Sequence, residues 1–555
     1  MRAIEAGLRF LVSQGVKYIF GVPAGSINAL YDCLHELPEL TSIVAKHESS
    51  SGYMAAAYTR ITGIPSVCVG SSGPGATNLV TPAANAWREK LPVIFLTGAI
   101  PTTKFGKGGG QELNADPIFA SVTKLSKTVT NPEDLPRVLA EAYNTAISGI
   151  PGPVHITIPI NMQMTEIGEP EALTAVQTQP VQPSADEIEA AAAAIKKAGR
   201  RGALMLGHGS KEFKDTVRRF AELTGWHVAT TPRGKGAFPE NHPLALGVYG
   251  LASNDSAVDY LRGDNHDLLM IVGSALGESA TSSWDERLVS GKQIIHIDHD
   301  KRELGKNFDT DYPVHGDIEL AVWQLIDRLT AGVQEEQLEE ISAAYREAAA
   351  ALEAAGPGTE DWNTRAAIRQ LNLLAPENAR YYVDIGEFMT YSIQNLVIRE
   401  SQEFDININF GGMGSGISGA LGAQLAEPAR PVISITGDGC FFMHGMEVLT
   451  AKEYNLPIVF VVINNARLGM VYHGHMMQYR RCLEDFSQQR TSIADVAKAL
   501  GVRYAQAESL DELRPELAKD WFDQSKGPIV IEINVEGNEI PPMGERVKFL
   551  QGATY

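Results

Sequence analysis

Short apolar runs alternate with helical patterns along this chain of 555 residues, and that alternation constrains the fold more than any other feature. In the first part of the chain the runs lie at 18–22, 41–45, 66–70, 93–98 and 153–159. The segments between them have helix periodicity, as in the N-terminal MRAIEAGLRFLVSQGV. This order predicts a parallel, doubly wound α/β sheet. Ligands of such sheets collect at the carboxyl ends of the strands.

The same alternation returns twice more. A Pro/Gln-rich stretch, TQPVQPSADE at 178–187, is typical of a linker. Apolar runs follow at 202–207, 267–273 and 293–298, and then at 381–386, 432–439, 456–465 and 528–535. We therefore predict three doubly wound parallel-sheet domains of the α/β class, spanning 1–170, 187–335 and 360–545. The first and third have similar patterns, as if one cofactor lay between two copies of one architecture.

Charge and composition exclude several kinds of partner. The chain has 47 Lys and Arg against 67 Asp and Glu, a formal charge of −20, which disfavours nucleic acid and anionic membrane surfaces. No apolar run approaches the roughly 18 residues that span a bilayer. The four cysteines, Cys33, Cys68, Cys440 and Cys482, lack metal-ligand spacing and are typical of reduced thiols. We expect a cytoplasmic protein whose phosphate ligands are held by a metal or by backbone N–H groups.

Two polar motifs follow neighbouring apolar runs in the third block. Gly437-Asp438-Gly439 ends the run at 432–439, and Asn464-Asn465 ends the run at 456–465. A carboxylate and an amide at adjacent strand ends can bind Mg²⁺, which prefers oxygen ligands and is often shared with a diphosphate. The alternative is that the glycines and the aspartate only form a turn after a strand.

A strand–GDG–helix–strand–NN arrangement resembles that of thiamine-diphosphate (ThDP) enzymes. The resemblance implies that Asp438 and Asn465 bind Mg²⁺ through their side chains and Arg467 through its backbone carbonyl. It also implies that the surrounding loops contact the cofactor, through Gly437, Asp438, Gly439, Cys440, Asn465, Gly469 and Met470.

Three more cofactor residues are implied by the same resemblance. Glu48, which precedes a small-residue helix, would bond the cofactor's aminopyrimidine ring and promote its activation. Met413 would support the bent cofactor from below, and Gly411 would bind the pyrimidine edge through its carbonyl. The alternatives are a carboxylate stabilised by a helix N-terminus for Glu48 and ordinary core packing for Met413.

The resemblance covers nearly the whole chain and is closest to the acetolactate synthase branch, through GVPAGSINALYD, SSGPGATNLV and IPPMG. Gln111 matches a glutamine of that branch that reaches the substrate. Gly110 and Gly474 stand where the branch has Phe and Trp, so we expect an acceptor pocket that is roomier or shaped by other groups. Glu387 stands where the branch has Gln in a diphosphate loop, and we expect its carboxylate to turn away from the phosphates.

His473 and His475 are candidate acid–base groups. On a strand or loop these alternating residues would face the same way; the alternative is a plain surface role. The middle block resembles the family's flavin or nucleotide domain, but Gly277-Glu278-Ser279 replaces an Arg-rich stretch. FAD is therefore left open as a cofactor, with no redox role.

The resemblance predicts a ThDP- and Mg²⁺-dependent lyase or transferase. It would decarboxylate a 2-oxoacid such as pyruvate and join the resulting enamine to an acceptor carbonyl. One alternative is a C–C hydrolase, lyase or decarboxylase acting on a bulkier or cyclic 1,2-dicarbonyl. Another is a silent homologue with a binding role, which the presence of Glu48 and the metal ligands disfavours. We expect a homodimer or homotetramer, because the family's sites form between the first block of one subunit and the third of another.

Overall fold

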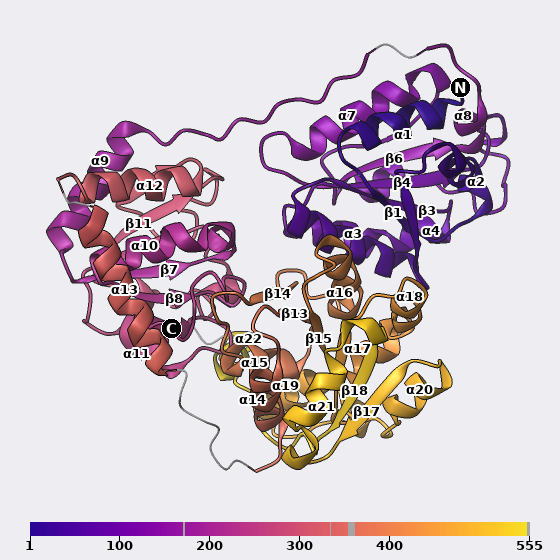
Figure 1. Cartoon of the computed structure of the whole chain (residues 1–555). Coiled ribbons are helices and arrows are strands. Elements are labelled where there is room, and N and C mark those ends of the chain that lie inside the picture. The colour runs from indigo at the N-terminus through magenta and orange to yellow at the C-terminus, as the bar shows by residue number, and fades with distance from the viewer. Residues whose placement is uncertain (170–171, 333–334, 353–360, 552–555) are drawn as a thin grey trace.

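Three parallel sheets of six strands each make up the chain (Figure 1). The computed structural model describes residues 1–169, 172–332, 335–352 and 361–551. Helices cover the sheets on both faces, so the predicted α/β class with three doubly wound domains is confirmed. The predicted boundary residues 170 and 360 lie outside the described residues.

The N-terminal sheet has the strand order β2-β1-β3-β4-β6-β5, with every pair parallel. Its strands are β1 (Tyr18–Gly21), β2 (Thr41–Val44), β3 (Ser66–Gly70), β4 (Val93–Ala99), β5 (Ser126–Thr128) and β6 (Val154–Pro159). Its helices are α1 (Ala3–Ser13), α2 (Asn28–Asp32), α3 (Glu48–Thr62), α4 (Pro74–Asn78), α5 (Val80–Arg88), α6 (Asp116–Phe119), α7 (Leu135–Ile147) and α8 (Ile160–Met164).

The C-terminal sheet repeats that topology strand for strand, in the order β14-β13-β15-β16-β18-β17. Its strands are β13 (Arg380–Val383), β14 (Glu403–Ile406), β15 (Val432–Gly437), β16 (Val459–Asn464), β17 (Arg503–Ala507) and β18 (Ile529–Asn534). Its helices are α14 (Thr364–Leu374), α15 (Glu387–Asn395), α16 (Ser415–Ala426), α17 (Asp438–His444), α18 (Glu447–Glu453), α19 (Gly469–Tyr479), α20 (Ile493–Ala499), α21 (Pro515–Trp521) and α22 (Gly544–Leu550).

The central sheet has a different order, β12-β11-β10-β7-β8-β9, in which the strand sequence reverses between β7 and β10. Its strands are β7 (Gly202–Leu206), β8 (His227–Thr230), β9 (Ala245–Val248), β10 (Leu268–Val272), β11 (Gln293–Asp298) and β12 (Tyr312–His315). Its helices are α9 (Ala185–Ala198), α10 (Lys214–Thr224), α11 (Asp255–Arg262), α12 (Ile318–Leu329) and α13 (Glu335–Leu352).

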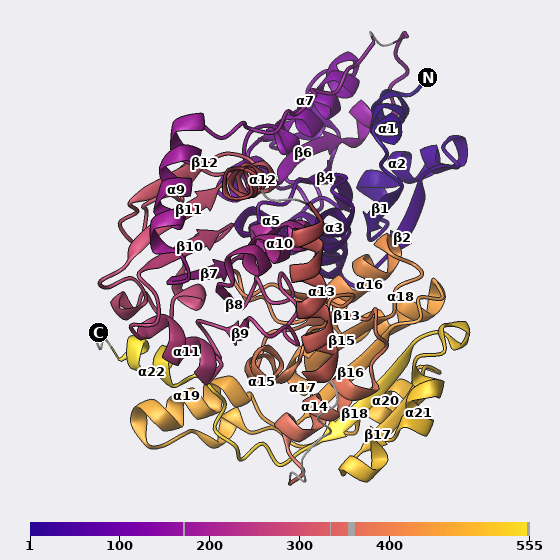
Figure 2. The ribbon, with the colours of Figure 1, turned by 60° about the vertical axis from the view of Figure 1, so that its left-hand side comes forward.

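The N- and C-terminal domains lie against each other, and the central domain lies beside both (Figures 1 and 2). The interface between the N- and C-terminal domains is formed by α3 and α16, two helices rich in Ala, Ser and Gly. A Cβ on Gly422 would lie 2.1 Å from the carbonyl oxygen of Met54, so the two helices touch backbone to backbone. Small residues are therefore required along this contact.

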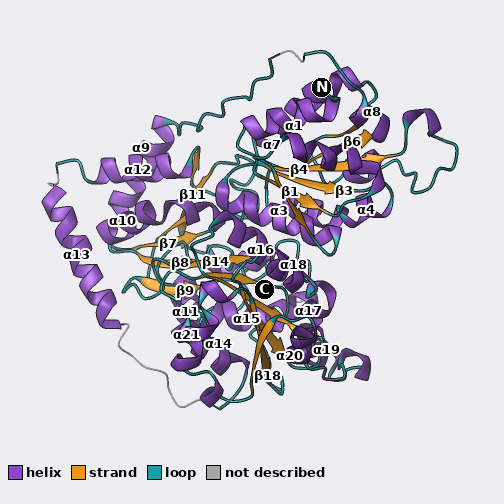
Figure 3. Cartoon of the chain, turned by 45° about the vertical axis from the view of Figure 1, so that its right-hand side comes forward, coloured by secondary structure: helices purple, strands orange, loops and turns teal. Residues whose placement is uncertain are grey.

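Residues 172–184 form an extended connector between the N-terminal domain and α9 (Figure 3). Residues 172–184 of this connector form no helix or strand, which agrees with the linker predicted at 178–187. Among the described residues no helix is long and apolar enough to cross a membrane.

Each of the predicted strands is present. The sequence did not reveal β5, β8, β9, β12, β14 and β17. Five of these six lie at sheet edges, where a strand needs less apolar surface and its pattern is weaker.

Candidate functional site

Asp438 and the Asn464-Asn465 pair lie together at the carboxyl edge of the C-terminal sheet. Asp438 begins α17 directly after β15, and Asn465 follows β16, the neighbouring strand. The Asp438 carboxylate accepts hydrogen bonds from the backbone N–H groups of Gly439 and Ala466. Burial nevertheless raises the pKa of Asp438 to about 6. A buried carboxylate and a buried amide are thus adjacent, as the sequence predicted.

The two asparagine amides each donate to a buried carboxylate. Asn464 Nδ2 lies 2.6 Å from Glu532 Oε1, and Asn465 Nδ2 lies 2.6 Å from Glu387 Oε1. The backbone N–H of Arg467 donates to Asn465 Oδ1 at 3.2 Å. The amide oxygen of Asn465 therefore faces the Arg467 backbone, the other implied contributor to a metal site.

The carboxylate of Glu387, which we expect to turn away from the phosphates, lies in one cluster with Asn465 and His473. Its side chain is 4% exposed, and its Oε2 lies 3.5 Å from His473 Nε2. Burial raises the pKa of Glu387 to about 7, and the nearby carboxylate of Asp438 raises it further. The reason is topological: α15 begins at the end of β13, which pairs with β15, so its first side chain points into the site.

Asp384 is a site residue that the sequence analysis missed. Its Oδ1 accepts from the N–H groups of Ile385 at 2.8 Å and Gly414 at 2.9 Å, and its Oδ2 accepts from Thr436 at 3.1 Å. These bonds hold the Gly411–Gly414 loop beside β15. Its position at the end of the apolar run YYVDIG was the available signal, because acids at such strand ends face ligands.

Met413 lies over the GDG turn. Its Cε is 3.4 Å from the position of a Cβ on Gly439, and its side chain is half-buried. Gly411 and Gly414 flank it with φ angles of +74° and +85°, which L side chains rarely adopt. The loop therefore presents a flexible apolar side chain between Asp438 and the N-terminal domain, where a Cβ on Gly412 would meet Tyr53 Oη.

The other predicted cofactor residues line the same edge. Cys440 is buried, and its Sγ donates to the carbonyl of Ile385 at 3.0 Å. A Cβ on Gly469 would lie 2.0 Å from Glu387 Oε2, and one on Gly437 would lie 2.7 Å from the Phe388 ring. Both glycines thus allow the 386–388 loop to approach. Met470, beside Gly469 on α19, is half-buried.

Glu48 belongs to a second cluster, in the N-terminal domain. It begins α3, and its Oε2 accepts from Asn78 Nδ2 at 2.9 Å. Its Oε1 lies 3.3 Å from the position of a Cβ on Gly75, within the SSGPGATN loop. Ser72 of that loop donates to the carbonyl of Gln111 at 2.6 Å. Gln111 is exposed and has a φ of +60°, a strained conformation for a non-glycine residue.

His473 and His475 do not face the same way. The expected strand or loop was wrong, because Gly469–Tyr479 is the helix α19, in which residues two apart point to opposite sides. His473 is buried, and its Nε2 donates to the carbonyl of Gly537 at 3.1 Å. His475 is partly exposed and its Nδ1 lies 2.5 Å from the carbonyl of Arg481. Only His473 reaches the Glu387–Asn465 group.

The two glycines that replace aromatic residues have different surroundings. No atom lies within 4 Å of the position of a Cβ on Gly110, which is exposed. A Cβ on Gly474 would lie 3.3 Å from Cε of the buried Met543. Space is therefore open at Gly110, whereas at Gly474 the C-terminal segment occupies it.

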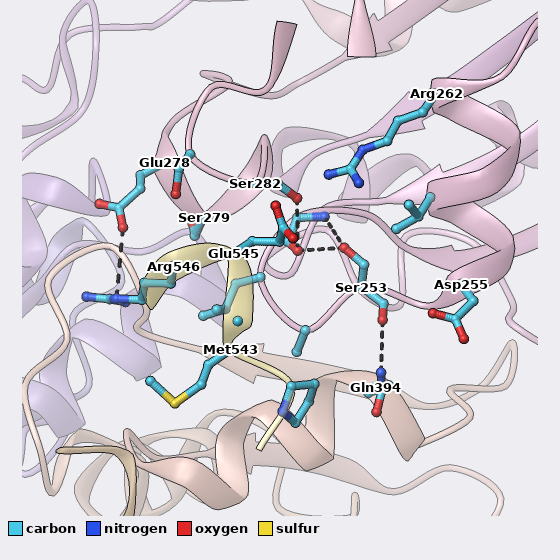
Figure 4. Close-up of a pocket in the computed structure, with 17 residues that line it drawn as sticks. Ser253, Asp255, Arg262, Glu278, Ser279, Ser282, Gln394, Met543, Glu545 and Arg546 are labelled. Carbon is cyan, nitrogen blue, oxygen red and sulfur yellow. Dashed lines mark hydrogen bonds and ion pairs between the residues drawn. The ribbon is translucent and has the colours of Figure 1, made fainter. Parts of the chain in front are cut away.

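A cavity of about 300 Å³ lies between the central domain, α15 and the segment that leads into α22 (Figure 4). Ser253 binds the Gly250 backbone and Gln394 on one wall, and Arg546 lies 3.9 Å from Glu278 on the other. None of the predicted site residues lines this cavity.

The strand order of the central sheet reverses between β7 and β10, and a backbone hydrogen bond joins the loops that follow these two strands. The N–H of Gly209 donates to the carbonyl of Gly273 at 3.0 Å, which joins the loops after β7 and β10. Asp298, at the end of β11, is buried and accepts from the N–H of Asp300 at 2.9 Å. The Gly209 N–H and one oxygen of the Asp298 carboxylate thus have protein partners.

Comparison with known families agrees with this architecture. Residues 1–118 match the family described as "Thiamine pyrophosphate enzyme, N-terminal TPP binding domain". Residues 188–325 match its central domain, and residues 384–533 match its C-terminal TPP binding domain. Two matched TPP binding domains of one topology define a thiamine-pyrophosphate-dependent enzyme. The chain belongs to the thiamine pyrophosphate enzyme family.

Similar proteins place it on one branch of that family. It is 31% identical to a probable acetolactate synthase large subunit of Methanocaldococcus jannaschii, covering 99% of this chain and 95% of the relative. It is 30% identical to acetolactate synthase isozyme 1 large subunit of Escherichia coli, over 96% and 95%. It is 31% identical to an acetolactate synthase large subunit of Corynebacterium glutamicum, over 98% and 88%. The resemblance predicted from motifs is confirmed.

Proposed function

We propose that this chain catalyses ThDP- and Mg²⁺-dependent decarboxylation of a pyruvate-like 2-oxoacid, followed by carboligation to an acceptor carbonyl. The observation that carries the proposal is the convergence of Asp438, Asn465 and the Arg467 backbone on one sheet edge. The names of the relatives supply the reaction type.

The donor set at this edge fits Mg²⁺. Asp438 offers a carboxylate, Asn465 an amide oxygen and Arg467 a carbonyl, and hard cations prefer such oxygen ligands. An Mg²⁺ ion bound there would supply positive charge for a diphosphate. That charge is needed because the chain itself carries a formal charge of −20.

The remaining steps fall to side chains of both domains. When bound, ThDP would supply a nucleophilic carbon for addition to the carbonyl of a 2-oxoacid and a cationic ring as the acceptor of the electron pair that decarboxylation releases. Glu48 would exchange a proton with the pyrimidine ring of the bound cofactor, and Met413, beside the GDG turn, would support it. Gln111 binds the substrate from an exposed position on the N-terminal domain. His473 packs beside Glu387 with its Nε2–H bound to the carbonyl of Gly537, and His475, which faces away, has no part in the chemistry.

Flavin is not part of the proposal. The backbone at the β7–β10 reversal and the Asp298 carboxylate already have protein partners. The absorbance spectrum of the purified protein in the visible range tests this, and a flavin spectrum would contradict it.

The acceptor side of the site favours a small carbonyl compound. Open space at Gly110 permits a larger acceptor, but Met543 occupies the space at Gly474. The alternative substrate class, a bulky or cyclic 1,2-dicarbonyl, is motivated by these glycines and by the two histidines at 473 and 475, and the names of the relatives do not favour it.

We further propose a homodimer, located in the cytoplasm, that uses the face beside Asp438. Phe442 and Met443 on α17 and Met446, which immediately precedes α18, are 50%, 57% and 45% exposed. Clustered large apolar side chains of this kind are typical of a protein interface. Light scattering of the protein, with Met443→Asp as a disrupting variant, measures the oligomeric state; a monomeric wild type would contradict the proposal.

The test of the activity is direct. Purified protein with ThDP, Mg²⁺ and pyruvate should release CO₂ and form acetolactate, detected by mass spectrometry. Omitting ThDP is the control. A panel of other 2-oxoacids and acceptor carbonyls identifies the preferred pair. Absence of ThDP-dependent product with every donor would overturn the proposed function.

A further inference from the structure

The free edge of β2 is covered by the C-terminal domain of the same chain. β2 is the last strand on its side of the sheet and leads directly into Glu48. The N–H of Val44 donates to Tyr454 Oη at 2.8 Å, and Tyr454 donates to the carbonyl of Ser42 at 3.1 Å. The outward-facing backbone groups of an edge strand are thereby satisfied by a side chain from another domain.

A second side chain continues this contact up to the residue before Glu48. Glu447 Oε1 accepts from the N–H of Lys46 at 2.9 Å and from the N–H of His47 at 3.2 Å. Its Oε2 accepts from the Thr450 hydroxyl at 2.7 Å. Both Glu447 oxygens therefore have defined donors, and one of them binds the two peptides that immediately precede Glu48.

The burial of Glu447 is costly and has no ion-pair partner to offset it. The side chain is 1% exposed, and it forms no ion pair with a Lys, Arg or His among the residues that the structure describes. A buried carboxylate is stabilised mainly by hydrogen bonds to it, and an apolar residue of similar volume would often be at least as stable. Its bonds to the Lys46 and His47 peptides indicate a role in placement.

We propose that Glu447 is a positioning residue that sets the location of Glu48. The inference rests on the proposed function of Glu48 as the residue that activates the cofactor. Glu447 begins α18 in the C-terminal domain and reaches the loop between β2 and α3 of the N-terminal domain. It fixes the backbone from which the Glu48 side chain extends. Loss of this contact shifts the carboxylate, and a displacement of about 1 Å can cost on the order of 100-fold in rate.

Two substitutions distinguish the effect of the length of the Glu447 side chain from the effect of its charge. Glu447→Asp keeps the charge but is one methylene shorter, so it withdraws from the Lys46 and His47 peptides. We expect kcat to fall about 10–100-fold with KM within twofold. Glu447→Gln keeps the length, with its oxygen on the two N–H groups and its amide on Thr450, and we expect kcat within about threefold of wild type. The matched control is Glu453→Gln, which removes only the exposed ion pair with the Lys46 side chain.

A second measurement does not depend on the loaded enzyme. Hydrogen–deuterium exchange of the cofactor-free protein, followed for the peptide that contains residues 42–49, should accelerate in Glu447→Asp and stay unchanged in Glu447→Gln and Glu453→Gln. If Glu447→Asp keeps the wild-type kcat or the wild-type exchange rate, or if Glu447→Gln is the slower enzyme, the inference is wrong. An active Glu48→Gln enzyme would instead overturn the role of Glu48 itself.

Discussion

In the N-terminal domain the second strand, β2, leads into a helix that begins with the carboxylate of Glu48. In the C-terminal domain the matching strand, β14, leads through a glycine loop to α16, whose cap is Gly414. At the third and fourth strands of each sheet the functional side chains are in the C-terminal domain instead. After β3 the chain has Ser71 and Ser72 and after β4 it has Ile100 and Pro101, whereas after β15 and β16 it has Asp438 and Asn465. One backbone topology thus presents different side chains at its carboxyl edge.

This contrast teaches that function depends on strand-end residues and not on the topology that the domains share. The N-terminal copy offers one half-buried carboxylate beside the Ser71–Asn78 loop. The C-terminal copy offers a buried carboxylate and an amide that suit a cation. Substitutions at Glu48 should therefore impair catalysis, whereas substitutions at Asp438 should impair cofactor binding.

The largest effect is expected in the N-terminal copy. Glu48→Gln keeps the shape of the side chain but removes its ability to exchange a proton, so kcat should fall about 1,000-fold. ThDP affinity, measured by titration calorimetry, should change less than threefold. Glu39→Gln, an exposed change in the same domain, is the control. If Glu48→Gln is as active as Glu39→Gln, Glu48 does not activate the cofactor.

The C-terminal copy should show the opposite pattern. Asp438→Ala removes the charged metal ligand, so Mg²⁺-dependent ThDP binding should weaken by at least about 10–100-fold. The same calorimetric titration measures it. If Glu48→Gln weakens ThDP binding to the same degree, the proposal that the C-terminal domain binds the cofactor and the N-terminal domain activates it is wrong.

The interface between the two copies should depend on small residues. Gly422→Ala would place a methyl group 2.1 Å from the Met54 carbonyl, and the overpacking should lower the free energy of unfolding by about 2 kcal/mol. Urea unfolding measures this. Gly277→Ala, where no atom lies within 4 Å, is the control. If Gly422→Ala leaves the free energy of unfolding unchanged, α3 and α16 can move apart without destabilising the protein.

The smallest expected effect is a pH dependence of stability caused by His155 on β6, a strand whose counterpart in the C-terminal sheet is β18. β6 buries His155 between Thr97 and Ser126, whereas β18 buries Glu532. Burial lowers the pKa of His155 to about 3, and the nearest carboxylate, Asp116, is already bonded to Thr128 and Thr157. The unfolded chain therefore binds a proton that the folded chain excludes.

Stability supplied by the neutral imidazole is present above pH 6.5 and is lost as the pH falls from 6.5 towards 3. At pH 5.5 the loss from His155 is about 1.4 kcal/mol relative to pH 8. His155→Gln should flatten this part of the unfolding curve measured by urea at several pH values, and the exposed His35→Gln should not. An unchanged slope in His155→Gln would contradict the prediction.

Much of the fold followed from the sequence because buried parallel strands are continuous apolar runs, as at 93–98 and 456–465. The adjacency of Asp438 and Asn465 followed as well, since neighbouring parallel strands end at the same edge. The helix α19 did not, because two glycines and two histidines within 469–479 hide its periodicity. The direction of Glu387 depends on which strand lies beside β13, and no local pattern encodes that pairing. Glu447 contacts residues some 400 positions away, so only the tertiary structure reveals it.

The exposed connector has a consequence for how the molecule holds together. Its two ends are bound, since the Val176 N–H donates to Asn144 and the Val181 carbonyl accepts from Asp317, while residues 176–182 are exposed. Such a stretch is a preferred site for a protease. The N-terminal domain is joined to the rest through α3 and α16, so a chain cut here should remain one particle. Continuity of the polypeptide is then needed to assemble the enzyme but not to keep it assembled.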